Sequence, residues 1–302
     1  MTQPLGQRHV RRVKGPRPCV DAAQVSVSSA SRTTAHRLRL LLAGATLVAA
    51  TALTAAALPV ADAGASASPA RAAARSTTHP SLPEKLSHLG DSRQVIIVRA
   101  RNWSTSHATL VAWQQDRTST WHRVLAPVPA RVGWNGFIWA AQRVQNSGET
   151  PAGTFRLLRG FGLARPAGVR LPYQVVDPSD WWPYDPRDPK TYNVQQLSRP
   201  KQARWRTSWA EHLATYRTQY RFVVVLDYNL PSGVHFNGTQ WVASHPANTA
   251  KGGGIFLHVN GDGATAGCVS VARPVMRHLL RWLAPGAHPR IVMGPRSVLP
   301  RL

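Results

Sequence analysis

The sequence is poor in cysteine and in acidic residues. It has two cysteines in 302 residues, and it contains 13 Asp and Glu but 37 Lys and Arg. No Cys-x-x-Cys pair occurs, and the equal spacing of His258, Cys268 and His278 brings no fourth ligand with it. The pattern therefore argues against a zinc site, and we expect neither a metal nor another cofactor. Beyond about residue 90 there is no internal repeat and no low-complexity tract, which favours a single globular domain.

The shortage of acid leaves a strong positive charge. The formal net charge is +24, and from Ser76 onward 27 basic minus 11 acidic residues still give +16. Such a field attracts polyanions, and nucleic acid is the first candidate to weigh. Because the chain is predicted to be exported, we expect no nucleic acid partner. Anionic cell-wall polymers or a membrane surface fit better, and plain non-specific attraction remains the alternative.

The prediction of export rests on the N-terminal segment. Basic residues between Arg32 and Arg39 precede an uncharged run, Leu40 to Ala61, and Ala-x-Ala sites follow. This pattern is typical of a secretory signal peptide, but the run is also long enough for a membrane anchor. Residues 1–65 are thus expected to be a signal peptide or an anchor, with translation starting near Val25 or Val27. The protein is then exported to the cell wall or the extracellular space, and it is membrane-anchored if the segment is retained.

Two further segments follow the leader. Residues 66–89 are rich in Ala, Ser and Pro and are predicted to be a linker. Residues 90–302 are long enough to bury a full core and are predicted to be one folded domain. Cys19 lies outside that domain, and no structural role is expected for it.

The folded region is predicted to be mainly β with a few covering helices. Short apolar runs between turn residues indicate strands. These runs are Gln94 to Ala100, Thr109 to Trp113, Trp121 to Leu125, Thr154 to Leu158, Tyr173 to Val176, Phe222 to Leu226, Gly254 to Val259 and Arg290 to Met293. Helical spacing of apolar residues predicts two helices, Pro200 to Tyr216 and Pro274 to Ala284.

Cys268 is the first candidate catalytic residue. It would be the one cysteine of the exported part, and a thiol kept in an oxidising compartment indicates chemistry or pairing with another molecule. His258 lies ten residues upstream on a predicted strand, and the glycine-rich loop between them can bring the two side chains together. A neighbouring imidazolium lowers the pKa of a thiol, so the pair can act as nucleophile and general acid/base. The backbone N–H groups of Gly267 and Cys268 are candidate oxyanion donors.

Two motifs resemble the L,D-transpeptidase catalytic domain, also called the YkuD domain. In that family a strand ending in Ile-x-x-His-Gly precedes Ser/Thr-His-Gly-Cys and an apolar residue. Phe256 to Val259 and Thr265 to Val269 stand at the equivalent positions. The family's Thr-Pro-x-Gly-x-Phe segment is present at Thr150 to Phe155. The resemblance covers roughly residues 133–294 and marks the chain as a divergent member.

The resemblance implies a β-sandwich and acyl transfer on peptidoglycan stem peptides. Cys268 would be the nucleophile and His258 the base, with the carbonyl of Val259 orienting the imidazole. The cysteine would attack the third, L-centred residue of a tetrapeptide stem and release the terminal D-Ala. An amine of a neighbouring stem as acceptor gives a 3→3 cross-link, water gives L,D-carboxypeptidase trimming, and a protein amine gives attachment to the wall.

The chain departs from the family pattern at two positions. Ala266 stands where the family has histidine, and Ser270 stands where a polar residue, commonly Arg, is found. These changes remove a donor and a charge from the substrate side, so they bear on substrate preference and rate. Tyr228, at the end of an apolar strand, is a further candidate for substrate binding.

Two other functions remain as alternatives. Papain-like and NlpC-like hydrolases place histidine after cysteine, against the order here, and a sortase needs an arginine that Arg273 or Arg277 supplies only loosely. A catalytically silent module that binds wall polyanions or glycans is the other alternative. It is favoured by Ala266, by the positive charge and by the eleven tryptophans.

Overall fold

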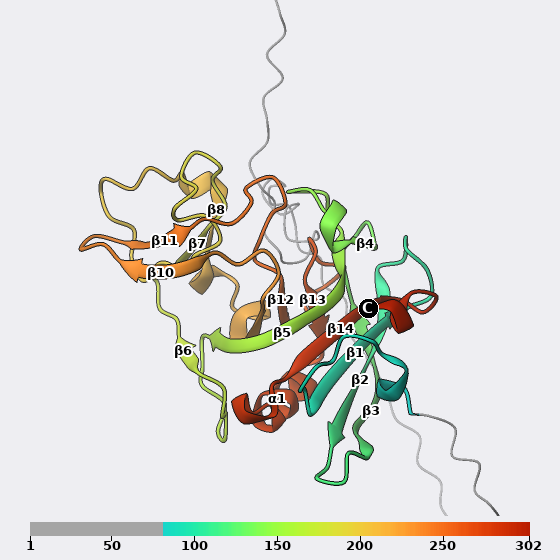
Figure 1. Cartoon of the computed structure of the whole chain (residues 1–302). Helices are drawn as coiled ribbons and strands as arrows, with labels where there is room; N and C mark the ends of the chain where they lie inside the picture. Colours follow the sequence, from blue (N-terminus) through green and yellow to red (C-terminus); the bar gives the residue numbers. More distant parts are fainter. Residues whose placement is uncertain (1–80) are drawn as a thin grey trace, which may run out of the picture. The chain divides into compact units, whose positions relative to one another are not determined.

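The computed structural model describes residues 81–302, and Figure 1 shows that this part is built mainly from strands. The mainly β prediction is confirmed. The strands are β1 (Gln94–Ala100), β2 (His107–Gln115), β3 (Trp121–Arg131), β4 (Phe137–Trp139), β5 (Thr150–Gly162), β6 (Tyr173–Val175), β7 (Trp181–Pro183), β8 (Ala210–His212), β9 (Val223–Leu226), β10 (Ser232–Phe236), β11 (Trp241–His245), β12 (Phe256–Val259), β13 (Val269–Val271) and β14 (Arg290–Pro295). The α-helix of this part is α1 (Arg273–Trp282).

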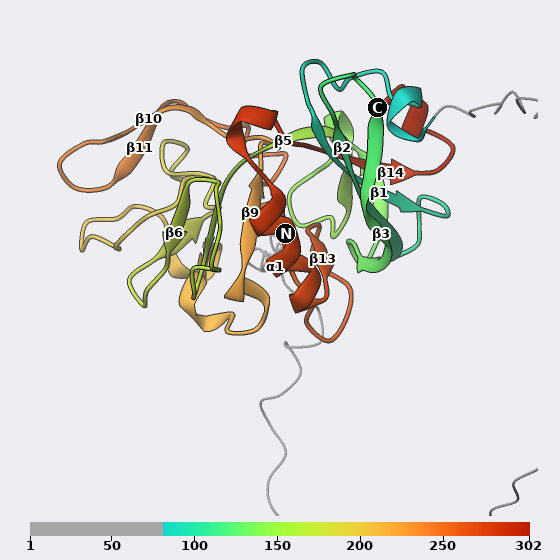
Figure 2. The same ribbon diagram turned by 90° about the horizontal axis from the view of Figure 1, so that it is seen from below.

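Most strands belong to one sheet, in the order β14-β1-β2-β3-β13-β12-β9-β5-β4. The long strand β5 joins the two halves of this sheet. Its first half pairs with β14 from Gly153 to Arg156, and its second half pairs with β9 from Leu157 to Phe161. One strand therefore passes from one half to the other, which gives the sandwich-like architecture of the predicted fold (Figure 2).

Strand β1 shows why these residues form a buried sheet. Its run of Val and Ile is inaccessible on both faces. Ile96 and Val98 face the main core, while Val95 and Ile97 face a second, smaller apolar cluster. This is the alternation that a strand imposes on successive side chains. Leu89 and Leu302 help to close the smaller cluster, so the packed structure begins before residue 90.

Helix α1 confirms the predicted second helix and covers the sheet near β12. Pro274 stands in its first turn, where proline fits because the N–H group there has no helical partner. Met276, Leu279 and Leu280 bury one face of the helix. Several short 3-10 turns complete the described elements, at Pro83–Lys85, Ala140–Gln142, Thr207–Trp209, Leu213–Thr215, Gln219–Arg221, Pro285–Ala287 and Leu299–Arg301.

The predicted helix from Pro200 to Tyr216 is wrong. That segment contains the short strand β8 between two 3-10 turns, and β8 pairs with β7 through Glu211 opposite Trp182. Glu211 is buried in this pair and accepts a hydrogen bond from the hydroxyl of Tyr220. These long-range contacts outweigh a helical spacing of aromatic residues, since local propensity is only a weak preference.

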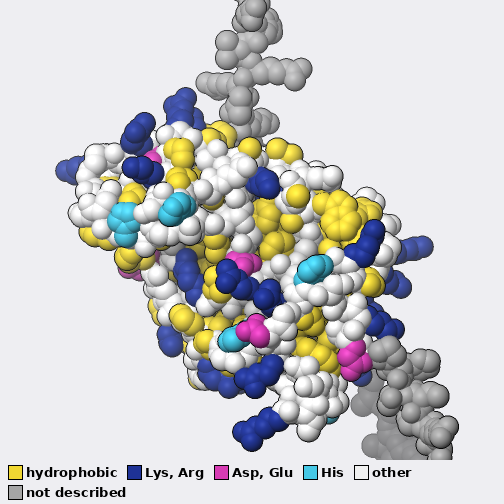
Figure 3. Space-filling view, in the orientation of Figure 1, with side chains coloured by type: hydrophobic (Ala, Val, Ile, Leu, Met, Phe, Trp, Pro, Cys, Tyr) yellow, Lys and Arg dark blue, Asp and Glu magenta, His cyan; other side chains and the backbone are white. Residues whose placement is uncertain are grey.

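The leader, most of the predicted linker and Cys19 lie outside the described residues. Within residues 81–302, no helix is long and apolar enough to cross a membrane. Figure 3 shows Lys and Arg side chains spread over one face of the molecule, with few acidic side chains between them.

Candidate active site

The candidate site lies where β12 and β13 run side by side in the middle of the sheet. The two strands are parallel, with His258 opposite Ser270, and β9 flanks β12 on its other edge. Paired residues in a ladder direct their side chains to the same face. The pairing of β12 with β13 thus places His258 next to the segment that begins with Cys268.

Cys268 is fully buried immediately before β13. Its Sγ atom is 3.2 Å from the backbone nitrogen of Phe256 and 3.2 Å from the carbonyl oxygen of Gly254. The sulfur is therefore held against the start of β12, two residues before His258. Cys268 is disulfide-bonded in the structure. Chemistry at this sulfur requires its thiol form.

His258 is also fully buried, and its ring is oriented by its own strand. The Nδ1 atom lies 2.8 Å from the carbonyl oxygen of Val259. Because a carbonyl only accepts, this contact assigns the proton to Nδ1 and leaves Nε2 as the basic atom. The ring of Tyr220 stands edge-on to the imidazole, with centroids 5.9 Å apart. Val259 thus occupies the position that its expected orienting role requires.

The turn before Cys268 is pinned by a buried threonine. The hydroxyl of Thr265 donates to the carbonyl of Cys268 at 2.6 Å and accepts from the N–H of Gly267 at 3.2 Å. In this conformation the Gly267 N–H, a candidate oxyanion donor, is already hydrogen-bonded within the turn. The backbone of Thr265 is itself tied to Val132 and Trp134 at the end of β3. Sequence reasoning did not assign a role to Thr265.

Gly267 must be a glycine for two reasons. Its φ is +137°, a conformation that residues with a Cβ rarely adopt. A Cβ at this position would also lie 2.9 Å from a guanidinium nitrogen of Arg143 and 2.9 Å from the carbonyl oxygen of Glu149. The turn is therefore packed tightly against the segment that precedes β5.

That contact identifies Arg143, a residue that sequence reasoning missed. Its guanidinium is buried beside the Cys268 turn and donates to the carbonyl oxygens of Glu149 and Lys251, both at 2.8 Å. It makes none of the ion pairs found within residues 81–302. Burial lowers the pKa of Arg143 from its usual value. Nothing local distinguishes Arg143 from the other arginines of this basic chain, so only the fold could single it out.

The two motifs meet in space. Thr150, which opens the upstream motif, accepts a hydrogen bond from Gly133 at 2.8 Å, and its hydroxyl reaches the carbonyl of Cys268 at 3.5 Å. Phe155, which ends that motif, packs edge-on to Tyr228 with ring centroids 5.8 Å apart. The upstream motif thus supports the cysteine turn and its surroundings.

The three expected substrate-side residues are all buried. Tyr228 lies beneath the guanidinium of Arg143 and bonds through its hydroxyl to Lys251 at 3.2 Å, and burial raises its pKa. Ala266 is 6% exposed within the cysteine turn. Ser270 stands opposite His258, and its hydroxyl has no hydrogen-bond partner among the described residues. Tyr228 thus reaches the site through Arg143, while Ser270 is the immediate neighbour of the imidazole.

Other residues singled out in the sequence lie elsewhere. His235 and His245 are exposed on the β10 and β11 hairpin, and Trp182 is buried in the core. Within the described part of the chain, no group of three or more His, Cys, Asp or Glu side chains could hold a metal ion.

Comparison with known proteins gives one match. The family profile of YkuD, the L,D-transpeptidase catalytic domain, matches residues 93–293. This span contains both motifs and every residue of the site described above. No curated protein and no solved structure gives a significant match to the chain.

Proposed function

The chain belongs to the L,D-transpeptidase catalytic domain family, whose members act on peptidoglycan stem peptides in the cell wall, and on that premise we propose that it is a cysteine acyltransferase. Cys268 is the nucleophile and His258 the general acid/base in this proposal. The observation that supports it most is the placement of His258 on β12 and of Cys268 immediately before the adjacent parallel strand β13, with the His258 ring oriented by the Val259 carbonyl at 2.8 Å.

The proposed reaction exchanges one amide bond for another. The thiolate of Cys268 attacks the carbonyl carbon of the third residue of a tetrapeptide stem, and a thioester forms. The bond to the terminal D-Ala breaks, and the imidazolium of His258 gives its proton to the leaving amine. Nε2 of His258 then takes a proton from the acceptor amine, which attacks the thioester and releases the Cys268 thiolate, so that the thiolate and imidazolium are restored. With water as acceptor, the product is a trimmed stem.

The remaining residues have supporting roles in the proposal. The amide N–H of Cys268, with that of Gly267 after release from Thr265, stabilises the oxyanion of the tetrahedral intermediate. Ser270 adjoins the imidazole, and Tyr228 supports the site through Arg143. Ala266 presents a methyl group where the family has histidine, so this chain works without that ring.

The catalytically silent wall-binding module is retained as the second candidate. The observation that favours it is Ala266, because the family histidine next to the nucleophile is absent from the site. In that case the site would bind stem peptides or wall polymers without forming a thioester.

The proposal is tested with the full chain and three variants. Cys19→Ser leaves Cys268 as the only cysteine of the chain, Cys268→Ala removes the nucleophile, and His258→Gln removes the base while keeping a polar side chain. Each protein is incubated, in the presence of a thiol reductant, with a purified tetrapeptide muropeptide, and the products are analysed by mass spectrometry.

We expect the wild-type and Cys19→Ser proteins to release D-Ala and the other two variants not to do so. Dimer formation identifies transpeptidation, and release alone identifies carboxypeptidase activity. A carbapenem-type acylating agent should add one adduct to the Cys19→Ser protein and none to Cys268→Ala. Absence of both adduct and D-Ala release in the Cys19→Ser protein would favour the silent module. Release of D-Ala by Cys268→Ala would contradict the assignment of the nucleophile.

A further inference from the structure

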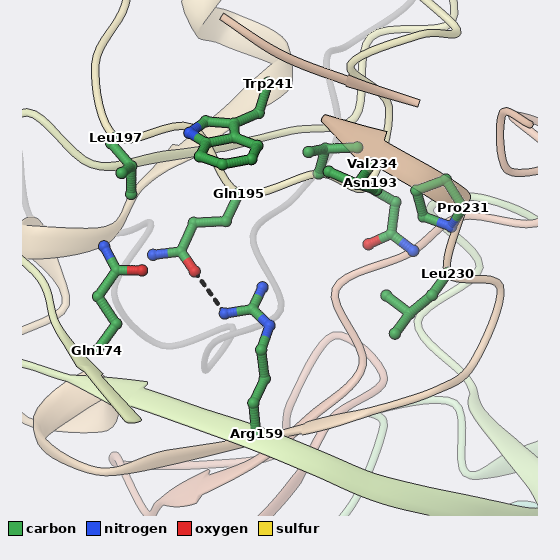
Figure 4. A pocket seen from close by; sticks show the side chains of 10 residues that line it. Arg159, Gln174, Asn193, Gln195, Leu197, Leu230, Pro231, Val234 and Trp241 are labelled. Carbon is green, nitrogen blue, oxygen red and sulfur yellow. Dashed lines mark hydrogen bonds between the residues drawn. The ribbon is translucent and has the colours of Figure 1, made fainter. Parts of the chain in front are cut away.

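A cavity of about 300 Å³ lies outside the Cys268 and His258 pair, between β5, β6 and the β10 and β11 hairpin. Figure 4 shows Arg159 rising from β5 with its guanidinium directed toward Gln195, while Gln174 and Trp241 extend toward the same space. The charge of this cavity is unbalanced, because the described residues that line it include an arginine and no acidic residue.

Arg159 carries the charge. Its guanidinium lies over the ring of Trp182, with 5.3 Å between the central carbon and the ring centroid, and donates to the Gln195 side-chain oxygen at 2.7 Å. It makes none of the ion pairs found within residues 81–302. Burial lowers its pKa to about 10, which still leaves the group charged at neutral pH. A guanidinium has five N–H donors, so one neutral oxygen satisfies little of its capacity.

Gln195 adds a second set of donors. It is 7% exposed, and its Nε2 atom is buried with no hydrogen-bond partner among the described residues. Its oxygen accepts from Arg159, and its amide N–H groups have no acceptor among the described residues. An unsatisfied buried donor costs free energy, and a ligand oxygen placed beside it would recover that cost. No acidic side chain of residues 81–302 lines the cavity; Asp180 accepts from the lining residue Gln174 at 3.5 Å and from the N–H of Asp177 at 2.8 Å.

The walls of the cavity are apolar. Leu197 and Val234 are both 44% exposed, and the ring of Trp241 closes another side. A small inorganic anion would leave these surfaces in water. The combination of an arginine fork, an amide donor and aliphatic walls suits a carboxylate carried on an aliphatic chain.

The cavity is close to the candidate nucleophile along the sheet. Arg159 pairs with Val225 on β9, Val225 pairs with Phe256 on β12, and the Phe256 N–H lies 3.2 Å from the Cys268 sulfur. Two strand spacings, about 10 Å, therefore separate Arg159 from Phe256. An extended peptide covers that distance in roughly three residues.

A second connection runs through the cavity wall. Asn193 lines the cavity, and its side-chain oxygen accepts the N–H of Gly254 at 2.9 Å. Gly254 in turn contacts the Cys268 sulfur through its carbonyl oxygen at 3.2 Å. A cavity residue and the candidate nucleophile thus both contact Gly254.

We propose that this cavity is an anion subsite in which Arg159 and Gln195 bind a free carboxylate of a peptide stem whose reacting carbonyl lies at Cys268. The assignment rests on the proposed function, because it takes the stem peptide as substrate. It deepens that function by making free carboxylates on the stem a determinant of which stems the protein accepts.

Three carboxylates of a tetrapeptide stem are candidates: the α-carboxylate of the second residue, a side-chain carboxylate of the third and the terminal carboxylate. The experiment measures the dissociation constants of four stems by calorimetry: one with all carboxylates free, and three with one carboxylate amidated in turn. The protein is the full chain with Cys268→Ala, so that no turnover occurs. Arg159→Gln is added as the test variant, Gln195→Ala as a second variant, and Arg123→Gln as a control that removes one exposed charge on β3.

We expect amidation of one particular carboxylate to weaken binding about ten- to hundredfold, as for the loss of a charged hydrogen bond. Arg159→Gln should weaken binding of the free stem by a similar factor and abolish the difference between free and amidated stems. Gln195→Ala should weaken binding less, and Arg123→Gln should leave the difference intact. Circular dichroism spectra and melting temperatures establish that each variant is folded.

The subsite is refuted if the folded Arg159→Gln variant binds the free stem as tightly as its parent, or if all three amidated stems bind as well as the free one. Neither result depends on turnover, so it is separate from failure of the proposed function. Carboxylate-dependent binding without release of D-Ala by the intact protein would support the subsite and favour the silent module.

Discussion

Replacing Thr265 with valine should loosen the turn that holds Cys268. Valine matches threonine in shape but lacks the hydroxyl that joins the carbonyl of Cys268, at 2.6 Å, to the N–H of Gly267, at 3.2 Å. Thr265 is fully buried, so water cannot replace the lost group without a rearrangement. Thr150 reaches the same carbonyl at 3.5 Å, which is too long to compensate fully.

The magnitude follows from the two groups left without partners. Each lost hydrogen bond contributes about 1 kcal/mol net, and a stranded buried polar group costs about 1–3 kcal/mol. Part of that cost is relieved by local adjustment, so we expect the free energy of unfolding of Thr265→Val to fall by about 2–4 kcal/mol. For a domain of this size, about 3 kcal/mol corresponds to a drop of roughly 6–12 °C in melting temperature.

Urea unfolding and thermal melting measure this change, and acylation of the reduced protein by a carbapenem-type agent measures its effect on the site. Thr265→Ser is the matched control, because it keeps the hydroxyl and loses only a methyl group. Serine should therefore retain most of the acylation rate, and valine should not. A valine variant within about 0.5 kcal/mol of the wild type, with an unchanged acylation rate, would refute the reasoning.

Three further changes test other parts of the structure. Gly254→Ala should lower the free energy of unfolding in urea by more than about 3 kcal/mol. The reason is that φ is +63° at this position and that an added Cβ would lie 1.8 Å from the Tyr184 hydroxyl oxygen. A milder loss of stability would contradict this packing. Burial alone would raise the pKa of Asp185, but its hydrogen bonds to Arg206 outweigh burial and hold the pKa below the usual range. A depressed folded-state pKa gives stability that is present above the unfolded value, near 4, and is lost as the pH falls through the folded value. Asp185→Asn should therefore weaken this pH dependence in unfolding curves between pH 2 and 6, and an unchanged slope would count against it. Ser270→Ala should leave the melting temperature unchanged or raise it by the equivalent of about 1 kcal/mol, since it removes a buried hydroxyl without a partner in the described part of the chain; a clear loss of stability would show that this hydroxyl is bonded.

The local pattern of the sequence predicted much of the fold. Apolar runs marked the buried strands, because the alternation of a strand fills two cores, as at Ile96 and Ile97. Helix α1 was also predictable, since a proline start and one apolar face are local signals. The helical spacing between Pro200 and Tyr216 failed because Glu211 pairs across to Trp182, which no local signal encodes.

The candidate site divides in the same way. Cys268 and His258 were singled out from one short segment, because the candidate nucleophile and the candidate base lie only ten residues apart. The structure places His258 on β12 and Cys268 immediately before the adjacent parallel strand β13, while their chemical roles stay predictions. Tyr228 was singled out because it follows the end of a strand. Its contact with the site is indirect, through Arg143, which the sequence did not indicate.

The sequence by itself determined the class of the fold, the two motifs and the strong positive charge, since each is a property of residue type or of near neighbours in the chain. Only the tertiary structure decided what surrounds them. It placed Arg143 against the turn before Cys268, although 125 positions separate Arg143 from Cys268. It also left Arg159 facing a cavity rather than a carboxylate. Such contacts join residues far apart in the chain, and only folding brings these atoms together.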